Sequence, residues 1–366
     1  MTPSSPTGLK PAVSRVAAGD AVCQAQAAAA NLPDPTHFVA LLSDSNNDAY
    51  CRLHGLTGQK SANCGLPSLP TYAGPWIATD GLPFATLQTL TADGAIISPA
   101  LFAADGTRQS AIPFTGTRSG LIADLFTPAQ CNNWTTNGNV GVGVFFGAGL
   151  QIFGGSSACA SAHQLLCMHA GSARQLSYAL PNGRQSFVTS TITAGGDLSK
   201  WTEAGGNTGI AAGDAICRNE AVANGVREPT SFKAWLSDGS VVPAINAIDR
   251  FQNDGPWVRL DGLPVAASKN ALISGQMRTL PITVGATLMN GSSMLTGTKS
   301  DGTSTGTDCH GWNSAANTDS FTEGTAYVMD SWTNALAEPC DLSYLQLYCF
   351  SDLDRLFDSG MEGIPY

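Results

Sequence analysis

The sequence predicts an α+β fold built as two tandem copies of one domain, followed by a short tail. Three observations predict it: AAGDAVC at residues 17–23 returns as AAGDAIC at 211–217, the segments that follow match in the same order, and eight of the ten cysteines divide between the copies in a repeated pattern. With 40 glycines, 20 prolines and only 13% charged residues, the composition favours turns and short strands over long charged helices. We therefore expect each copy to contain many turns and short strands rather than long helices with many salt bridges.

The matching segments define the domain boundaries. Residues of the first copy correspond, in order, to residues of the second as follows: 35–45 to 229–239, 74–85 to 255–266, 114–119 to 295–300, 131–134 to 309–312, and 163–169 to 345–350. The repeated unit is too long for a solenoid repeat, so each copy should fold independently. The expected domains are residues 1–175, with an inserted loop at 45–72, and residues 176–352; residues 353–366 form the tail.

The cysteines divide into matching sets. The first copy holds Cys23, Cys131, Cys159 and Cys167, and the second holds Cys217, Cys309, Cys340 and Cys349. The other two, Cys51 and Cys64, lie in the inserted loop and most simply pair with each other. Because the number is even and no C-x-x-C pair occurs, disulfides in an oxidising compartment are favoured over metal ligation.

Four cysteines allow three connectivities in each copy, and the ends of the unit favour one of them. Asp214 is expected to cap the start of a helix that runs to Asn224-Gly225. LQLYCF at 345–350 alternates as a strand does. A first helix tied to the last strand gives the outer pair Cys217–Cys349 and the inner pair Cys309–Cys340; by repetition, the first copy has Cys23–Cys167 and Cys131–Cys159.

The repeated unit resembles the C-type-lectin-like fold, and most closely its endostatin-like branch, which includes bacterial secreted domains of unassigned function. The segments that carry the resemblance are GDAIC with its helix, TSFKAWLSDG, MLTGTKSDGTSTGTDCHGW and PCDLSYLQLYCF. The resemblance implies that each copy is a twisted, mostly antiparallel sheet with one or two short helices and a long loop region. The family joins a helix to the last strand by an outer disulfide and holds its long-loop region by an inner one. By the same resemblance, 186–201 forms the first strand and turn of the second copy, whereas the first copy has only KPAVSRV there, so its first strand is short or missing. The resemblance implies fold more than function, because this fold hosts unrelated activities.

Composition and missing motifs exclude several partners. The net charge of −10, with no cluster of Lys or Arg, argues against nucleic acid and heparin-like polyanions. No apolar run reaches the length of a membrane span, and no signal peptide is visible at the start of the chain. The EPN, QPD and WND tripeptides of calcium-dependent lectins are missing. No histidine precedes His37 and the arginines are scattered, so neither the zinc site nor the heparin site of endostatin is carried over. We expect no cofactor.

Two groups of residues are candidate sites. Asp44, Asn46 and Asp48 place oxygen donors at alternate positions, for which a solvated turn is the favoured interpretation and a calcium site the alternative. Trp76 with Trp257, and Trp134 with Trp312, recur at matched positions and should be core residues. Aromatic residues that do not recur lie between the inner cysteines, where the resembled fold binds ligands. Core packing is favoured for each of them taken alone, and as a group they are the candidate contact surface: Phe321, Tyr327 and Trp332 in the second copy, and Phe145 and Phe146 in the first.

These observations favour a secreted, non-catalytic binding or adhesion protein that recognises a glycan or a surface protein through its long loops. The alternative is a structural subunit of an extracellular fibre or pilus-like assembly, in which the chain binds copies of itself. A hydrolase is the least favoured class, because no G-x-S-x-G turn or H-E-x-x-H pair is present and all cysteines are expected to be paired.

Overall fold

The structure is a computed structural model of the 366-residue chain, and it describes residues 15–92, 94–109, 113–123, 130–135, 158–161, 163–171, 182–190, 195–285, 293–325 and 329–353. It is an α+β protein that divides into two compact units, Met1–Ala179 (domain 1) and Leu180–Tyr366 (domain 2). The boundary lies four residues after the position expected from the repeats.

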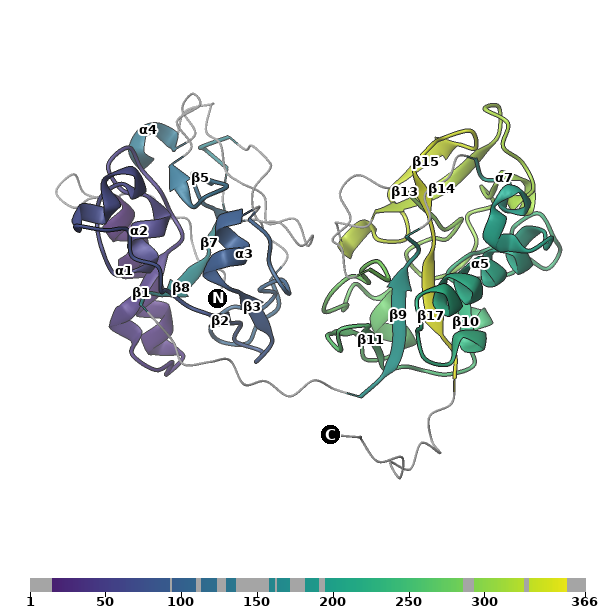
Figure 1. Cartoon of the computed structure of the whole chain (residues 1–366), viewed down its shortest axis with the longest axis horizontal. Helices are drawn as coiled ribbons and strands as arrows, with labels where there is room; N and C mark the ends of the chain where they lie inside the picture. The colour runs from purple at the N-terminus through teal and green to yellow at the C-terminus, as the bar shows by residue number, and fades with distance from the viewer. Residues whose placement is uncertain are drawn as a thin grey trace. The chain divides into compact units, whose positions relative to one another are not determined.

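Domain 2 contains two sheets, packed with one long helix and short helical turns (Figure 1). Its helices are α5 (Gly209–Ala223), α6 (Lys269–Ile273) and α7 (Cys309–Trp312), with single turns η3 (Leu198–Lys200), η4 (Thr202–Ala204), η5 (Pro229–Ser231), η6 (Ile248–Arg250) and η7 (Met329–Ser331). Its strands are β9 (Arg184–Val188), β10 (Phe232–Ala234), β11 (Trp257–Arg259), β12 (Pro264–Ala266), β13 (Ser293–Leu295), β14 (Ser320–Thr325), β15 (Leu336–Pro339), β16 (Leu345–Gln346) and β17 (Tyr348–Ser351).

The strands of domain 2 form a five-stranded sheet in the order β10-β17-β9-β11-β12 and a four-stranded sheet in the order β15-β14-β13-β16. Both sheets are mostly antiparallel; the parallel pairs are β9 with β11 and β13 with β16. The expected last strand is therefore two strands, because the chain passes from one sheet to the other at Leu347. Residues 345–351 are buried on both faces, which the alternation of the sequence did not predict.

Domain 1 repeats this arrangement with shorter strands. Its helices are α1 (Arg15–Ala29), α2 (Ala49–Leu53), α3 (Leu87–Ala92) and α4 (Cys131–Trp134), with turns η1 (Pro35–His37) and η2 (Lys60–Gly65). Its strands form antiparallel pairs β1 (Phe38–Ala40) with β8 (Cys167–His169), β2 (Trp76–Ile77) with β3 (Pro83–Ala85) and β5 (Thr117–Arg118) with β6 (Ile122–Ala123), and a parallel pair of β4 (Pro113–Phe114) with β7 (Gln164–Leu165). Of the segment KPAVSRV, residues 10–14 lie outside the described residues, and Arg15 and Val16 begin α1.

All ten cysteines are paired, in the five disulfides expected from the sequence: Cys23–Cys167, Cys51–Cys64, Cys131–Cys159, Cys217–Cys349 and Cys309–Cys340. The outer bridges join residues 144 and 132 positions apart, so in the chain-entropy description each stabilises its domain by about 4–5 kcal/mol. No disulfide crosses between the domains.

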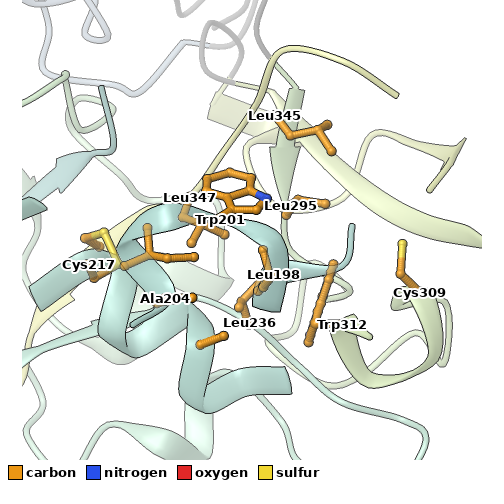
Figure 2. Packing of buried hydrophobic residues seen from close by; sticks show 14 of the residues in the cluster. Leu198, Trp201, Ala204, Cys217, Leu236, Leu295, Cys309, Trp312, Leu345 and Leu347 are labelled. Atoms are coloured by element: carbon orange, nitrogen blue, oxygen red, sulfur yellow. A yellow bond between two sulfur atoms is a disulfide. The ribbon is translucent and has the colours of Figure 1, made fainter. Parts of the chain in front are cut away.

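A large apolar cluster in domain 2 joins the long helix, both sheets and both disulfides (Figure 2). Trp201, Leu236 and Trp312 are each at most 2% exposed within it. The repeated tryptophans are core residues as expected, since Trp76, Trp257 and Trp312 are buried, although Trp134 is only half-buried. Among the described residues of domain 1, two smaller apolar clusters are found, one around Trp76 and Phe84 and the other around Cys23 and Ala40.

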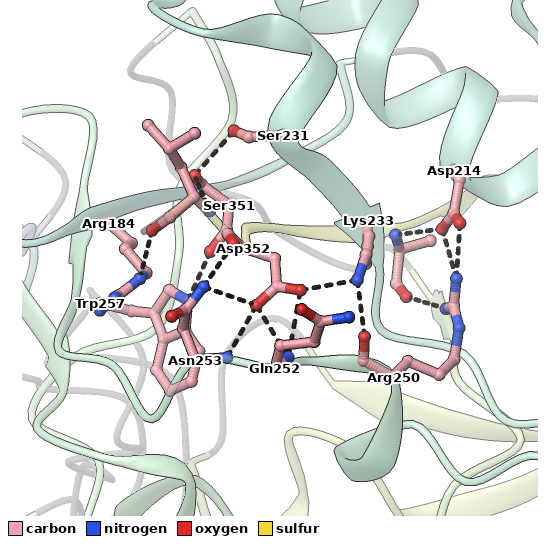
Figure 3. A network of polar contacts seen from close by, with 12 residues as sticks. Arg184, Asp214, Ser231, Lys233, Arg250, Gln252, Asn253, Trp257, Ser351 and Asp352 are labelled. Atoms are coloured by element: carbon pink, nitrogen blue, oxygen red, sulfur yellow. Dashed lines mark hydrogen bonds and ion pairs between the residues drawn. The ribbon is translucent and has the colours of Figure 1, made fainter. Parts of the chain in front are cut away.

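Asp214 does not cap the helix, contrary to the sequence prediction. Helix α5 begins earlier, after Thr208, so Asp214 lies inside it and faces the sheet. There its carboxylate accepts hydrogen bonds from the backbone N–H of Ala234 (2.9 Å) and from Nη2 of Arg250 (2.6 Å), as Figure 3 shows. The predicted end of the helix is confirmed, because Asn224 is the C-cap and the φ angle of Gly225 is +64°.

The same ion pair recurs in domain 1. Asp20 on α1 accepts a hydrogen bond from the N–H of Ala40 (2.9 Å) and pairs with Arg52, whose Nη1 also donates to the carbonyl oxygens of Ala40 (2.5 Å) and Leu42 (2.7 Å). In both domains an Asp–Arg pair therefore fastens the long helix to the edge strand.

Candidate functional site

Each domain contains a four-residue turn in the left-handed region of backbone space, next to its inner disulfide. In domain 2 the turn is Cys309–Trp312, with φ angles of +50°, +55°, +64° and +66°. Left-handed backbone costs roughly 1–2 kcal/mol for each residue other than glycine, so the surrounding contacts must hold this turn in place.

Three contacts hold the turn of domain 2. Cys309 is bridged to Cys340, and the indole Nε1 of Trp312 donates to the carbonyl oxygen of Ser237 (2.8 Å). The buried carboxylate of Asp308 accepts hydrogen bonds from the backbone N–H groups of Gly311 (3.0 Å) and Gly239. Because these contacts come from distant segments, the turn and the loop at 238–245 form one fixed unit.

Domain 1 keeps the turn but fastens it differently. Residues Cys131–Trp134 have φ angles of +49° to +60°, and the Trp134 indole donates to the carbonyl oxygen of Ser43 (2.9 Å). The link to the neighbouring loop is made by Asn133, whose side chain bonds both the N–H and the hydroxyl of Ser45 (2.9 Å each). The frame is thus common to both domains, and the side chains around it differ.

A polar pocket of about 300 Å³ lies beside the turn of domain 2. It is lined by Ser240, Gly306, Thr307, Asp308, His310, Thr318, Asp319 and Ser320. These residues come from the turn, from the segment before it, from the start of β14 and from the 238–245 loop. No lysine or arginine is among them, so the lining offers mainly hydroxyl and carboxylate groups.

His310 and Asp319 are neighbours in the lining of this pocket. The His310 ring is 74% exposed, and its Nε2 lies 3.1 Å from Oδ1 of Asp319. Ser314 donates a hydrogen bond from its hydroxyl to the other carboxylate oxygen of Asp319. The hydrogen bonds from Ser314 and His310 hold the pKa of Asp319 below its ordinary value, so this carboxylate is charged at neutral pH.

An exposed apolar loop adjoins the pocket. Val241 and Val242 follow the pocket residue Ser240 and are 41% and 100% exposed. The loop is closed by two backbone hydrogen bonds of 2.8 Å between Asp238 and Ile245. At the same place, domain 1 carries its insertion with the Cys51–Cys64 disulfide. Apolar side chains exposed beside a polar pocket are typical of surfaces that contact a ligand.

The aromatic residues selected from the sequence do not form this site. Phe321 is fully buried and Trp332 is 3% exposed, so the prediction that they form a contact surface is wrong and the alternative, core packing, holds for both. Trp332 packs against Trp235 and Tyr348, with ring centroids 5.0 and 5.3 Å apart. Tyr327, Phe145 and Phe146 lie outside the described residues.

The oxygen-rich segment at Asp44, Asn46 and Asp48 is a turn held by hydrogen bonds from backbone N–H groups to its carboxylates. Oδ1 of Asp44 accepts hydrogen bonds from the N–H groups of Asn46 (2.9 Å) and Asn47 (2.8 Å), and the Asp48 carboxylate accepts from two further backbone N–H groups. Within the described ranges, no three His, Cys, Asp or Glu side chains are grouped as metal ligands. The prediction of a solvated turn is wrong for the two carboxylates, because Asp44 and Asp48 are buried, at 7% and 5% exposed, and accept their hydrogen bonds from backbone N–H groups.

The pocket residues were missed because they share no family motif. One signal was present: the turns read CHGW and CNNW, and glycine and asparagine are the residues that adopt left-handed backbone most readily. A left-handed turn beside a cysteine, flanked by Asp308 and Asp319, would have indicated this region.

Comparisons with known proteins do not assign a family. No protein-family model matches the chain, and no curated protein is significantly similar to it in sequence. Among the helices that the structure describes, none combines the length and apolar character needed to cross a membrane.

Proposed function

We propose that the protein is a secreted, non-catalytic binding protein whose domain 2 recognises a glycan or a surface protein through the pocket at Ser240, His310 and Asp319. The observation that carries the proposal is the comparison of the two domains among the described residues: the strained turn and its inner disulfide recur, whereas the side chains that hold the turn, Asp308 in domain 2 and Asn133 in domain 1, and the loops that they bind differ. Variation of loops on a fixed frame is typical of proteins that use a common scaffold for recognition. The same arrangement supports the resemblance to the C-type-lectin-like fold.

The chemistry of the pocket favours a glycan over a protein. Hydroxyl and carboxylate groups from Thr307, Thr318, Asp319 and Ser320 can exchange hydrogen bonds with sugar hydroxyls, and the exposed valines beside them can contact the apolar face of a sugar ring. Because the charged groups of the lining are carboxylates and one imidazole, neutral sugars should bind better than sulfated or carboxylated ones.

The polar groups favour binding over catalysis. Nucleophilic catalysis needs a nucleophile hydrogen-bonded to its base. Here Ser314 and His310 both bond to Asp319, which lies between them, so the histidine does not activate the serine. The ten cysteines are all in disulfides, so no thiol is available as a nucleophile. Five disulfides are also typical of proteins that work in an oxidising, extracellular compartment.

The experiment is a glycan-array measurement with the labelled full chain and three variants. We expect a neutral glycan to bind, and His310→Ala and Asp319→Asn each to weaken binding by about tenfold or more, which is the loss expected for one charge-assisted hydrogen bond. Asn132→Ala is the matched control, because Asn132 occupies the position of His310 in the turn of domain 1. It should bind as well as the unchanged protein.

Two results would contradict the proposal. One is an array with no bound glycan, or with glycans that bind equally well to His310→Ala and Asp319→Asn. The other is release of sugar from a bound glycan during incubation, since hydrolysis would make the protein an enzyme. Thermal unfolding of each variant shows whether a loss of binding reflects the pocket or the fold.

A further inference from the structure

The central strand of the five-stranded sheet in domain 2 is β9. It pairs antiparallel with β17 and parallel with β11, and Ser186, Phe187 and Val188 on it are fully buried (Figure 1). The strand thereby joins the half-sheet β10-β17 to the half-sheet β11-β12.

Among the residues described in domain 1, the same two half-sheets are present without a central strand. They are β1-β8 and β2-β3, which correspond to β10-β17 and β11-β12. They are tied together in the same way, because the Trp76 indole donates to the carbonyl oxygen of His169 (2.8 Å) just as Trp257 donates to that of Ser351 (2.9 Å). The half-sheets of domain 1 are thus linked by the same bond that spans the filled sheet of domain 2.

The backbone of β8 offers hydrogen-bonding groups to the gap between the half-sheets. On the β1 side, the carbonyl oxygen of Leu166 accepts from Leu41, and the N–H of Ala170 donates to His37. Since backbone groups alternate along an antiparallel strand, those of Cys167 point to the opposite edge. The counterpart of Cys167 is Cys349, which pairs with Phe187 on β9.

Apolar side chains around the gap are more exposed than their counterparts in domain 2. In domain 2 the side chains are covered: Phe232, Leu347 and Cys349 are fully buried, and Val258 is 5% exposed. In domain 1 the matching residues are more exposed: Phe38, Leu165 and Cys167 are half-buried, and Ile77 is 53% exposed. We refer to the gap bounded by β8 and β2, with Phe38 and Ile77, as the strand slot.

We propose that the strand slot of domain 1 binds an extended strand supplied by another protein. Strand addition to an exposed sheet edge is a general mode of peptide recognition, in which backbone hydrogen bonds give affinity and side-chain positions give specificity. Domain 2 shows the required chemistry, because β9 runs antiparallel to β17 and the ring centroids of Phe187 and Phe232 are 4.9 Å apart. The bound strand should likewise run antiparallel to β8 and place an aromatic ring against Phe38. This inference does not depend on the pocket of domain 2.

The sequences at the two ends of this chain fit the slot poorly. Residues 1–14 contain three prolines, which remove ladder hydrogen bonds, and residues 354–366 carry three carboxylates within nine residues. Neither contains an aromatic residue followed by a β-branched one, as Phe187 and Val188 do on β9. The occupant that the proposal names is therefore a segment of a different protein that carries the β9 pattern, an aromatic residue followed by a β-branched one.

The test uses the full chain and a fluorescent peptide with the sequence of residues 182–190, NGRQSFVTS. Fluorescence anisotropy should show saturable binding, and the peptide with Phe187→Asp should bind at least about tenfold more weakly, as expected when an aromatic side chain is no longer buried. In the protein, Ile77→Asp should abolish binding without affecting folding, because this side chain is already exposed. Leu336→Asp is the matched control: Leu336 is an apolar residue, 63% exposed, in domain 2, and its change should leave binding unaltered.

Hydrogen exchange locates the bound peptide. The amide of Cys167 should exchange rapidly in the free chain and slowly with peptide present. The proposal is overturned if no saturable binding occurs or if Ile77→Asp binds as well as the unchanged protein. It is also overturned if the Cys167 amide is already protected from exchange in a monomer without peptide, because a segment of the same chain would then fill the slot. Oligomers of the free protein that form through this edge would overturn it too, because a second copy would then be the occupant.

Discussion

The Asp–Arg pair that fastens the long helix to the edge strand allows a stability prediction with an internal control. In domain 2, Asp214 accepts two hydrogen bonds of 2.6 Å from Arg250 and one of 2.9 Å from Ala234. The side chains of Asp214 and Arg250 are 17% and 10% exposed. Asp214→Ala leaves the guanidinium largely buried and without its counter-ion.

Breaking a fully buried ion pair costs about 3–5 kcal/mol, and the partial exposure of Asp214 places the expected loss near the lower limit, at about 3 kcal/mol. For a domain of this size, that loss lowers the unfolding temperature by roughly 6–12 °C. Asp214→Asn should lose less, because an amide oxygen can still accept the Ala234 N–H. Differential scanning calorimetry of the full chain measures both variants.

Domain 1 supplies the control. Asp20→Ala removes the equivalent pair with Arg52, whose side chain is 7% exposed. Each variant should lower the transition of its own domain and leave the other within about 2 °C, which corresponds to less than 1 kcal/mol. The reasoning is refuted if Asp214→Ala moves neither transition, or if it moves both equally, because the pair would then not act within one independently folded domain.

Three further changes test individual contacts by urea unfolding. Burial alone would raise the pKa of Asp352, but hydrogen bonds from Lys233 (2.6 Å) and from backbone N–H groups outweigh burial and lower that pKa (Figure 3). The charged carboxylate therefore stabilises the fold above about pH 4, and this stabilisation is lost as the pH falls through the lowered pKa. Asp352→Asn should therefore reduce stability at pH 7 and flatten its decline below pH 4; an unchanged acid limb would contradict this. Trp312→Phe removes the hydrogen bond to Ser237 and should cost about 1 kcal/mol, beyond any packing loss, whereas a neutral effect would mean that the turn is held elsewhere. Asp308→Ala leaves two backbone N–H groups unpaired and should cost about 2–4 kcal/mol, and a loss below 0.5 kcal/mol would show that water replaces the carboxylate.

Much of the frame could be predicted from the sequence because duplication makes it visible twice. Four of the five disulfides follow from cysteines that recur in the same order, the fifth follows from the two cysteines left in the inserted loop, and the end of helix α5 follows from Asn224-Gly225. Its start did not, because Asp214 has the chemistry of a cap and also that of an ion-pair partner. Its partner Arg250 is not at the matched position of Arg52, since the insertion in domain 1 alters the register. Only the tertiary structure shows that the two arginines perform the same task.

The candidate site was harder to predict for a different reason. An isolated aromatic such as Trp332 has the same sequence signature on a surface and in a core, and its burial depends on Trp235 and Tyr348, which are distant along the chain. The pocket depends on the left-handed turn at Cys309–Trp312, and local preferences oppose that conformation at cysteine and tryptophan. Long-range contacts impose it, and these contacts are not visible in a linear pattern.

Disulfide mapping tests most directly whether two copies of one cross-linked frame make up this protein. Proteolysis of the native chain under non-reducing conditions, after alkylation of any free thiol, should give five linked peptide pairs, with Cys23 joined to Cys167 and Cys217 joined to Cys349. No cysteine should be alkylated. A peptide that links the two domains, such as Cys23 joined to Cys217, or several alkylated cysteines in the native protein, would contradict the account.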